Sequence, residues 1–139
     1  MKKYYEKIKY LGVQKTDSHT NQRTTILLNE LTFALVILQS FVYPEFLIKG
    51  EFFPVLITFI VQFFTGLPLV FSYFNKSGIG KWYFNTIMPL LMTVIIITHG
   101  QALRADYCYL IFAVTGALFF KKLNYKIFIF GVIIISYFF

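Results

Sequence analysis

The side chains that could bind a ligand or move a proton are few, and they lie in or beside long apolar stretches. Glu30 is the one acid inside such a stretch, and a carboxylate there costs roughly 3 kcal/mol or more unless it is paired, protonated or near the interface. It would act either as a proton-sensitive coupling residue or as a structural residue paired with a basic side chain, for example Lys81 or Lys122. We favour the structural role.

Two amides, Gln62 and Asn85, lie within the second and third apolar stretches. Amides and hydroxyls form hydrogen bonds between membrane helices, usually for well under about 2 kcal/mol each. We therefore interpret them as groups that hold helices together, with a polar ligand pocket as the alternative. Gly66, Pro68 and Pro89 are hinge candidates in the same stretches, because proline removes a backbone donor and can bend a helix.

The segment 99–106 is a dense polar cluster between two apolar stretches. His99 is a ligand or coupling candidate because histidine titrates near physiological pH. Arg104 is a second candidate because its guanidinium group could pair with an anionic ligand. Pairing of Arg104 with Asp106, or with lipid headgroups, explains the same residues without a ligand.

Motifs of catalytic, nucleotide-binding and metal-binding sites are missing from the sequence. There is no GxxxxGK[ST], CxxC, HExxH, GxSxG or GxGxxG pattern. Two histidines and one cysteine cannot complete a zinc site. Hydrolysis within a membrane would need paired acids or a Ser/His pair at depth, and Glu30 stands alone. We expect no catalytic residue, no metal, no cofactor and no enzymatic activity.

The composition indicates that these residues are carried by a membrane protein. Of the 139 residues, 58% are hydrophobic and only 14% are charged, against about 25% charged in soluble domains. A soluble chain of this size buries only about 70% of the surface that it exposes when unfolded, so it could not cover so much apolar surface. A soluble enzyme, a disordered tail and a disulfide scaffold are therefore excluded.

Five apolar windows predict an all-α, polytopic transmembrane helical bundle, since about 20 apolar residues cross the hydrocarbon layer. The windows are 26–48, 52–74, 82–98, 105–120 and 127–139. The last window has 13 residues and ends without a flanking charge. We therefore expect the final span to be truncated or to continue elsewhere.

The basic residues predict how the bundle is oriented. With five spans, eleven of the 13 Lys and Arg residues fall on one side, six of them in a basic segment over residues 1–25. Because basic residues of short loops stay in the cytoplasm, we expect the N-terminus inside and residues 26–139 as the transmembrane domain, in a bacterial cytoplasmic (inner) membrane. The net charge of +7 then reflects topology and anionic lipid headgroups, and nucleic-acid binding is not expected. Tyr4, Tyr5 and Ile8 predict a short interfacial amphipathic helix within the basic segment.

Several short patterns occur in a characteristic order along the chain. Leu27-Leu28-Asn29 follows the basic segment, Phe74-Asn75-Lys76-Ser77-Gly78 follows the second window, and Asn85 with Pro89 marks the third. A short loop at Gly100 and Phe119-Phe120-Lys121-Lys122 complete the order. This order is similar to the N-terminal multi-pass membrane sensor region of bacterial signalling proteins, of the membrane histidine kinase and nucleotide cyclase type. The resemblance implies about six spans before a cytoplasmic output domain, whereas this sequence has five windows and no such domain.

The function expected from these observations is that of a non-enzymatic integral membrane module that senses or relays a signal by shifting its helix packing. Its partners would be the lipid bilayer and either further copies of the chain or a cytoplasmic output domain or protein. Two alternatives stay open. One is a small oligomeric pore-forming or defence-associated accessory membrane protein, and the other is half of a small transporter.

Overall fold

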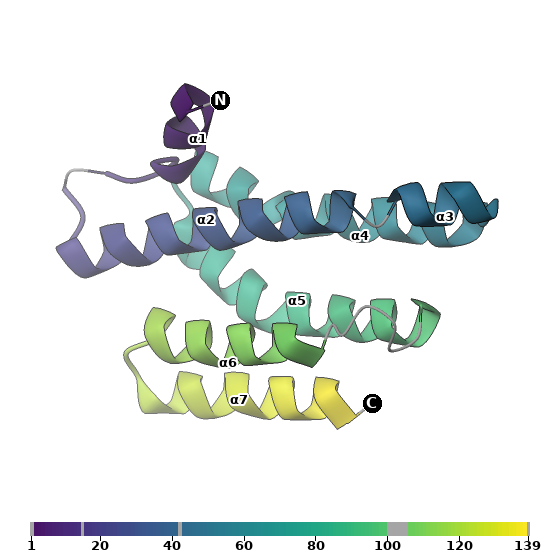
Figure 1. Cartoon of the computed structure of the whole chain (residues 1–139). Coiled ribbons are helices and arrows are strands. Elements are labelled where there is room, and N and C mark those ends of the chain that lie inside the picture. The colour runs from purple at the N-terminus through teal and green to yellow at the C-terminus, as the bar shows by residue number, and fades with distance from the viewer. Residues whose placement is uncertain (1, 15, 42, 100–105, 139) are drawn as a thin grey trace. The chain divides into compact units, whose positions relative to one another are not determined.

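The computed structural model describes residues 2–14, 16–41, 43–99 and 106–138, and the secondary structure of these ranges is entirely helical. The helices are α1 (Lys2–Lys9), α2 (His19–Ser40), α3 (Tyr43–Lys49), α4 (Phe52–Tyr73), α5 (Ser77–His99), α6 (Asp106–Phe119) and α7 (Leu123–Phe138) (Figure 1). The predicted all-α class is thus confirmed for this part of the chain. The chain divides into two compact units, Met1–Lys81 and Trp82–Phe139.

The first unit is built on an antiparallel helix pair. Helices α2 and α3 follow one another in the same direction, and α4 returns along both of them (Figure 1). Helix α1 packs on α2. The end of the unit that carries α1 therefore also contains the start of α2, the end of α4 and the start of α5.

In the second unit, α6 and α7 form an antiparallel pair (Figure 1). Hydrogen bonds and aromatic contacts from the later part of α5 join it to this pair. Phe84 of α5 and Phe112 of α6, both fully buried, meet edge to face with ring centroids 5.4 Å apart. This geometry is the one that aromatic quadrupoles favour.

The helix ends of the first unit are closed by local backbone chemistry. After α3, Gly50 adopts a positive φ of 71°, and the amide of Glu51 donates to the carbonyl of Phe46 at 2.9 Å. After α4, Asn75 adopts a φ of 58°, and the amide of Lys76 donates to the carbonyl of Phe71 at 2.8 Å. Both are Schellman ends, for which glycine and asparagine are the preferred residues.

The first predicted span, 26–48, is not one helix. Helix α2 ends at Ser40 and α3 begins at Tyr43. The cause is Pro44, which has no backbone donor for the Ser40 carbonyl and whose ring would clash with that carbonyl in a continuous helix. At the second position of α3, however, proline is well tolerated because amides in the first turn have no helical partner.

The other predicted windows agree more closely with the helices. The window 52–74 matches α4 within one residue, and 82–98 lies inside α5. The window 105–120 corresponds to α6, of 14 residues, whereas 127–139 starts four residues later than α7. Among the described residues, α4, with 22 residues, is the helix that is both long and apolar enough to cross a membrane. The shorter apolar stretches are Tyr109–Phe119 and Leu123–Tyr137.

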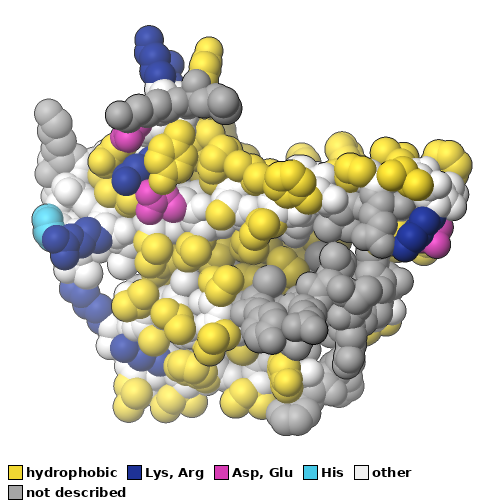
Figure 2. All heavy atoms as spheres, in the orientation of Figure 1, with side chains coloured by type: hydrophobic (Ala, Val, Ile, Leu, Met, Phe, Trp, Pro, Cys, Tyr) yellow, Lys and Arg dark blue, Asp and Glu magenta, His cyan; other side chains and the backbone are white. Residues whose placement is uncertain are grey.

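The side chains of α4 are distributed in the reverse of the pattern found in soluble proteins. Thr58, Thr65 and Ser72 are buried, while Phe59 and Phe63 are 62% and 65% exposed. Other helices also carry large exposed apolar side chains, which include Leu38, Ile97, Leu110, Leu118, Ile134 and Ile135. Figure 2 shows such hydrophobic side chains spread over the visible surface. In lipid, buried hydroxyl side chains permit close helix contact and hydrogen bonding, and outward apolar side chains are in their preferred solvent.

Candidate functional site

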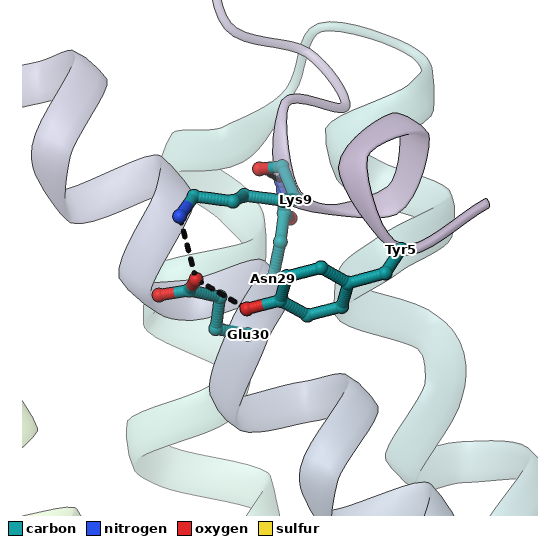
Figure 3. Close-up of polar contacts among 4 residues, drawn as sticks. All are labelled: Tyr5, Lys9, Asn29 and Glu30. Carbon is teal, nitrogen blue, oxygen red and sulfur yellow. Dashed lines mark hydrogen bonds and ion pairs between the residues drawn. The ribbon is translucent and has the colours of Figure 1, made fainter. Parts of the chain in front are cut away.

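A polar cluster holds α1 against α2. The Tyr5 hydroxyl donates to Glu30 Oε1 at 2.7 Å, and Lys9 Nζ lies 3.1 Å from the same oxygen (Figure 3). The bonds to this carboxylate raise the pKa of Tyr5 and of Lys9 above their ordinary values. Glu30 is therefore paired, as we expected, but its partners are Lys9 and Tyr5 rather than Lys81 or Lys122.

Asn29 lies beside Glu30 and binds the chain that leaves α1. Its amide nitrogen donates to the carbonyl oxygen of Lys9 at 3.1 Å and to that of Leu11 at 2.9 Å. The last carbonyls of a helix lack hydrogen-bond donors within the helix. Asn29 supplies such a donor to the Lys9 carbonyl at the end of α1. Asn29 is fully buried, and its bonds fix the docked position of α1.

The turn after α1 also packs closely against α4. Gly12 has a φ of 68°, and a Cβ atom at this position would lie 2.0 Å from the carbonyl oxygen of Ser72. No side chain can occupy that space, and only glycine adopts this φ without strain. We call the contacts of Tyr5, Lys9, Leu11 and Gly12 with α2 and α4 the N-terminal clasp.

A buried lysine extends these contacts to α5. Lys81 is 6% exposed, and its Nζ donates to Asn21 Oδ1 at 2.6 Å. The side-chain nitrogen of Asn21 donates in turn to Asp17 Oδ2 at 2.9 Å. Its backbone N–H donates to Ser18 Oγ at 3.3 Å, which caps the start of α2. Burial lowers the pKa of Lys81 to about 8, and the charge of Asp17 opposes this shift. The start of α2 is thereby joined to the start of α5.

Gln62 bridges the break between α2 and α3. Its Nε2 donates to the Val36 carbonyl at 2.8 Å and to Ser40 Oγ at 2.7 Å, both on α2. Its Oε1 accepts from the Tyr43 hydroxyl on α3. One turn further along α4, Thr65 Oγ1 accepts from Gln39 Nε2 at 3.0 Å. Gln62 thus binds three helices together.

Asn85 forms a buried hydrogen bond between two helices of the second unit. Its Oδ1 accepts from Thr115 Oγ1 of α6 at 3.0 Å. A Cβ atom on Gly116 would lie 3.4 Å from Asn85 Oδ1 and 2.8 Å from Ile129 Cγ2 of α7. Helices α5, α6 and α7 therefore converge at Gly116, where a larger residue would force the neighbours apart.

A second hydrogen-bonded cluster joins the same three helices further along. Thr93 Oγ1 lies 2.8 Å from the Tyr109 hydroxyl and donates to the Ser136 carbonyl at 2.9 Å. The Tyr109 hydroxyl donates to that carbonyl as well, at 3.1 Å. The hydroxyls of Thr93 and Tyr109 thus join α5 and α6 to α7.

Some buried oxygens of the first unit have no hydrogen-bond partner. On α2 they are Thr25 Oγ1, Asn29 Oδ1, Thr32 Oγ1 and Gln39 Oε1, and on α4 the oxygen is Ser72 Oγ. Each buried polar atom left unpaired costs about 1–3 kcal/mol. The α2–α4 pair thus has a polar interior, although its exposed side chains are mostly apolar.

The remaining candidates are the three hinge residues and the ligand candidates His99 and Arg104. Helix α4 is continuous through Gly66 and Pro68, and α5 is continuous through Pro89. A bend at these three residues stays a prediction. His99 is the last residue of α5, and its side chain lies outside the described residues, as does Arg104 entirely. Within the described ranges, no three His, Cys, Asp or Glu side chains come together at a metal-binding distance.

Sequence reasoning missed several residues of these clusters. Tyr5 and Glu30 are 25 residues apart, and Asn21 and Lys81 are 60 apart, so no local pattern joins them. The one local signal was Ser18, a preferred N-cap residue directly before the first helical residue. It could have placed the start of α2 at His19, inside the basic segment 1–25.

The clasp joins α1 and the turn after it to α2 and α4, and Lys81 joins the start of α2 to the start of α5. Comparisons of the chain with protein-family models, with curated proteins and with solved structures find no match.

Proposed function

We propose that the chain is a non-enzymatic integral membrane module whose N-terminal clasp passes a change at the cytoplasmic surface to the membrane-spanning helices. The observation that carries this proposal is the inverted distribution of side chains on α4. Thr65 and Ser72 are fully buried, whereas phenylalanines on the opposite side are mostly exposed. Exposure of so large an apolar surface to water is unfavourable and rare in soluble proteins, whereas its exposure to the hydrocarbon of a bilayer is favourable.

The proposed topology has five spans with the N-terminus in the cytoplasm. The first span consists of α2 and α3 together, the second is α4, and α5, α6 and α7 supply the others. Charge supports this assignment, because Lys3, Lys7 and Arg23 belong to one end of the α2–α4 pair and Lys49 to the other. The 14 residues of α6 extend about 21 Å at 1.5 Å per residue, so the bilayer must thin there or the flanking residues must extend the helix.

Labelling of single cysteines in intact bacteria tests the topology. In a Cys108→Ser background, we introduce Tyr4→Cys, Gly50→Cys, Gly78→Cys and Lys122→Cys separately, and add a maleimide that cannot cross membranes. The variant at position 50 should react in intact cells, and the other three only after the cells are made permeable. Reaction at position 122 from outside, or a chain recovered in buffer without detergent, would contradict the proposal.

The relay is tested by opening the clasp and observing the far end of the first unit. Spin labels on Ile48→Cys and Phe59→Cys, both exposed, report the spacing of α3 and α4 in liposomes. With Asn29→Asp, which cannot donate to the Lys9 and Leu11 carbonyls, the distance distribution should shift or broaden. An unchanged distribution would contradict a relay through this unit. Ion conductance of the same liposomes would instead favour the pore-forming alternative.

A further inference from the structure

Docking of α1 separates its basic side chains into two groups. Lys9 faces α2, where it pairs with Glu30 and lies over the rings of Tyr5 and Tyr10 at 6.0 and 5.7 Å from their centroids. Lys3 and Lys7 are exposed and four residues apart, and therefore lie on one face of the helix. Among the described residues no ion pair involves either of them.

Aromatic side chains border this exposed pair. Tyr4 is 72% exposed and Tyr10 is 51% exposed. Lysine with neighbouring tyrosine is the combination enriched where protein meets lipid headgroups, because the ring tolerates both apolar and polar surroundings. Glu6 is the acid on the exposed part of α1.

The clasp also fixes the level along α2 at which the exposed face of α1 with Lys3 and Lys7 lies. The exposed side of α2 is polar at His19, Thr20 and Arg23, and it is apolar at Ile37 and Leu38. Glu30, which binds Lys9 and Tyr5, lies between these two regions. Helix α1 is therefore held at the level where the surface of α2 changes from polar to apolar. Basic side chains of the first unit gather at this end (Figure 2, upper left).

We propose that the face of α1 formed by Lys3, Tyr4 and Lys7, extended by Tyr10, is a binding site for the anionic headgroups of phospholipids in the cytoplasmic leaflet. This inference rests on the proposed membrane topology. The phosphodiester of the lipid pairs with the ammonium groups of Lys3 and Lys7, and the tyrosine rings lie at the headgroup level. Each basic residue near an anionic membrane surface contributes about 1 kcal/mol, or about fivefold in affinity.

The test uses the full-length chain purified in detergent and titrated with phosphatidylglycerol or phosphatidylcholine of the same acyl chains, with bound lipid counted by native mass spectrometry. Lys3→Gln combined with Lys7→Gln should lower the preference for phosphatidylglycerol by about 25-fold, from two contributions of about fivefold. The matched control, Lys121→Gln with Lys122→Gln, removes the same charge next to α7, on the same proposed side of the membrane but outside α1, so a site on α1 requires it to lose clearly less of the preference.

A second variant keeps the test independent of folding defects. Glu6→Gln removes the acid from the exposed part of α1 and should raise phosphatidylglycerol binding about fivefold. Glycerol phosphate at millimolar concentration should not displace the lipid, and displacement would identify a site for free phosphate instead. Equal losses in the two double variants, or no effect of Glu6→Gln, would overturn the site on α1.

The two proposals can fail separately. If the chain dissolves without detergent, the membrane assignment fails and the lipid site fails with it. If the chain stays in the membrane fraction but binds both lipids equally, the lipid site alone is wrong. Helix content and melting temperature of each variant should equal those of the wild type, because Lys3, Glu6 and Lys7 are exposed.

Discussion

The amide nitrogen of Asn29 lies 2.9 Å from the carbonyl oxygen of Leu11 and joins α2 to the chain that leaves α1. This buried contact differs in kind from the neighbouring ion pair of Lys9 and Glu30, whose side chains are 27% and 32% exposed. Partly exposed ion pairs contribute only about 0–1 kcal/mol. The attachment of α1 therefore depends mainly on Asn29.

Asn29→Asp should release α1, because a carboxylate cannot donate to the two carbonyls and would repel them. The loss of two buried hydrogen bonds costs about 1–3 kcal/mol or more, so trypsin should cleave after Lys7 and Lys9 at least about fivefold faster. Glu30→Gln should change the rate by less than about fivefold. Asn124→Asp, at an exposed position of α7, is the matched control. Equal cleavage of the Asn29 and Asn124 variants would show that the clasp does not hold α1.

Lys81 should make the stability of the first unit depend on pH. The pKa of Lys81 is lowered to about 8 in the folded chain, against about 10.4 when unfolded. Between these values the unfolded chain binds more protons, so the free energy of unfolding rises with pH. Relative to Lys81→Met, the wild type should gain about 1–3 kcal/mol from pH 7 to pH 10. Thermal unfolding in detergent at both pH values measures this gain, and a constant difference would contradict the shift.

Gly116 and Gly66 should respond oppositely to larger side chains. Gly116→Val should destabilise the second unit by about 1–3 kcal/mol, because a Cβ atom there would lie 2.8 Å from Ile129. Gly66→Ala should be neutral or stabilising by up to about 1 kcal/mol, because nothing lies within 4 Å of its Cβ position. Unfolding in a denaturing detergent measures both effects. A destabilising Gly66→Ala would indicate that α4 uses Gly66 as a hinge.

Pro44→Ala should allow α2 and α3 to join, because alanine restores the amide that can donate to the Ser40 carbonyl. Backbone amides of residues 43–46 should then exchange with solvent at least about tenfold more slowly. Pro54→Ala, in the first turn of α4, is the control and should change little. Unchanged exchange after Pro44→Ala would mean that another feature separates α2 from α3.

The sequence predicts a feature well when the residues that determine it are neighbours along the chain. The bounds of α4 follow closely from the sequence because a continuous apolar run is bordered by Gly50 and Asn75, which favour Schellman ends. The window 26–48 was predicted as one helix because Pro44 lies within a continuous apolar run, and hydropathy does not register a missing backbone amide. The partners of Glu30 could not be predicted, since they depend on how α1 folds back on α2.

The three hydrogen bonds of Gln62 have a mechanical consequence. Because α2 ends at Ser40 and α3 begins at Tyr43, a rotation of α2 about its axis is not carried into α3 by one continuous helix. It reaches α3 through the amide of Gln62, which holds Ser40 with its nitrogen and Tyr43 with its oxygen. Gln62 is therefore the contact through which α2 and α3 would rotate together, and Gln62→Leu should leave both helices in place while their rotations become independent.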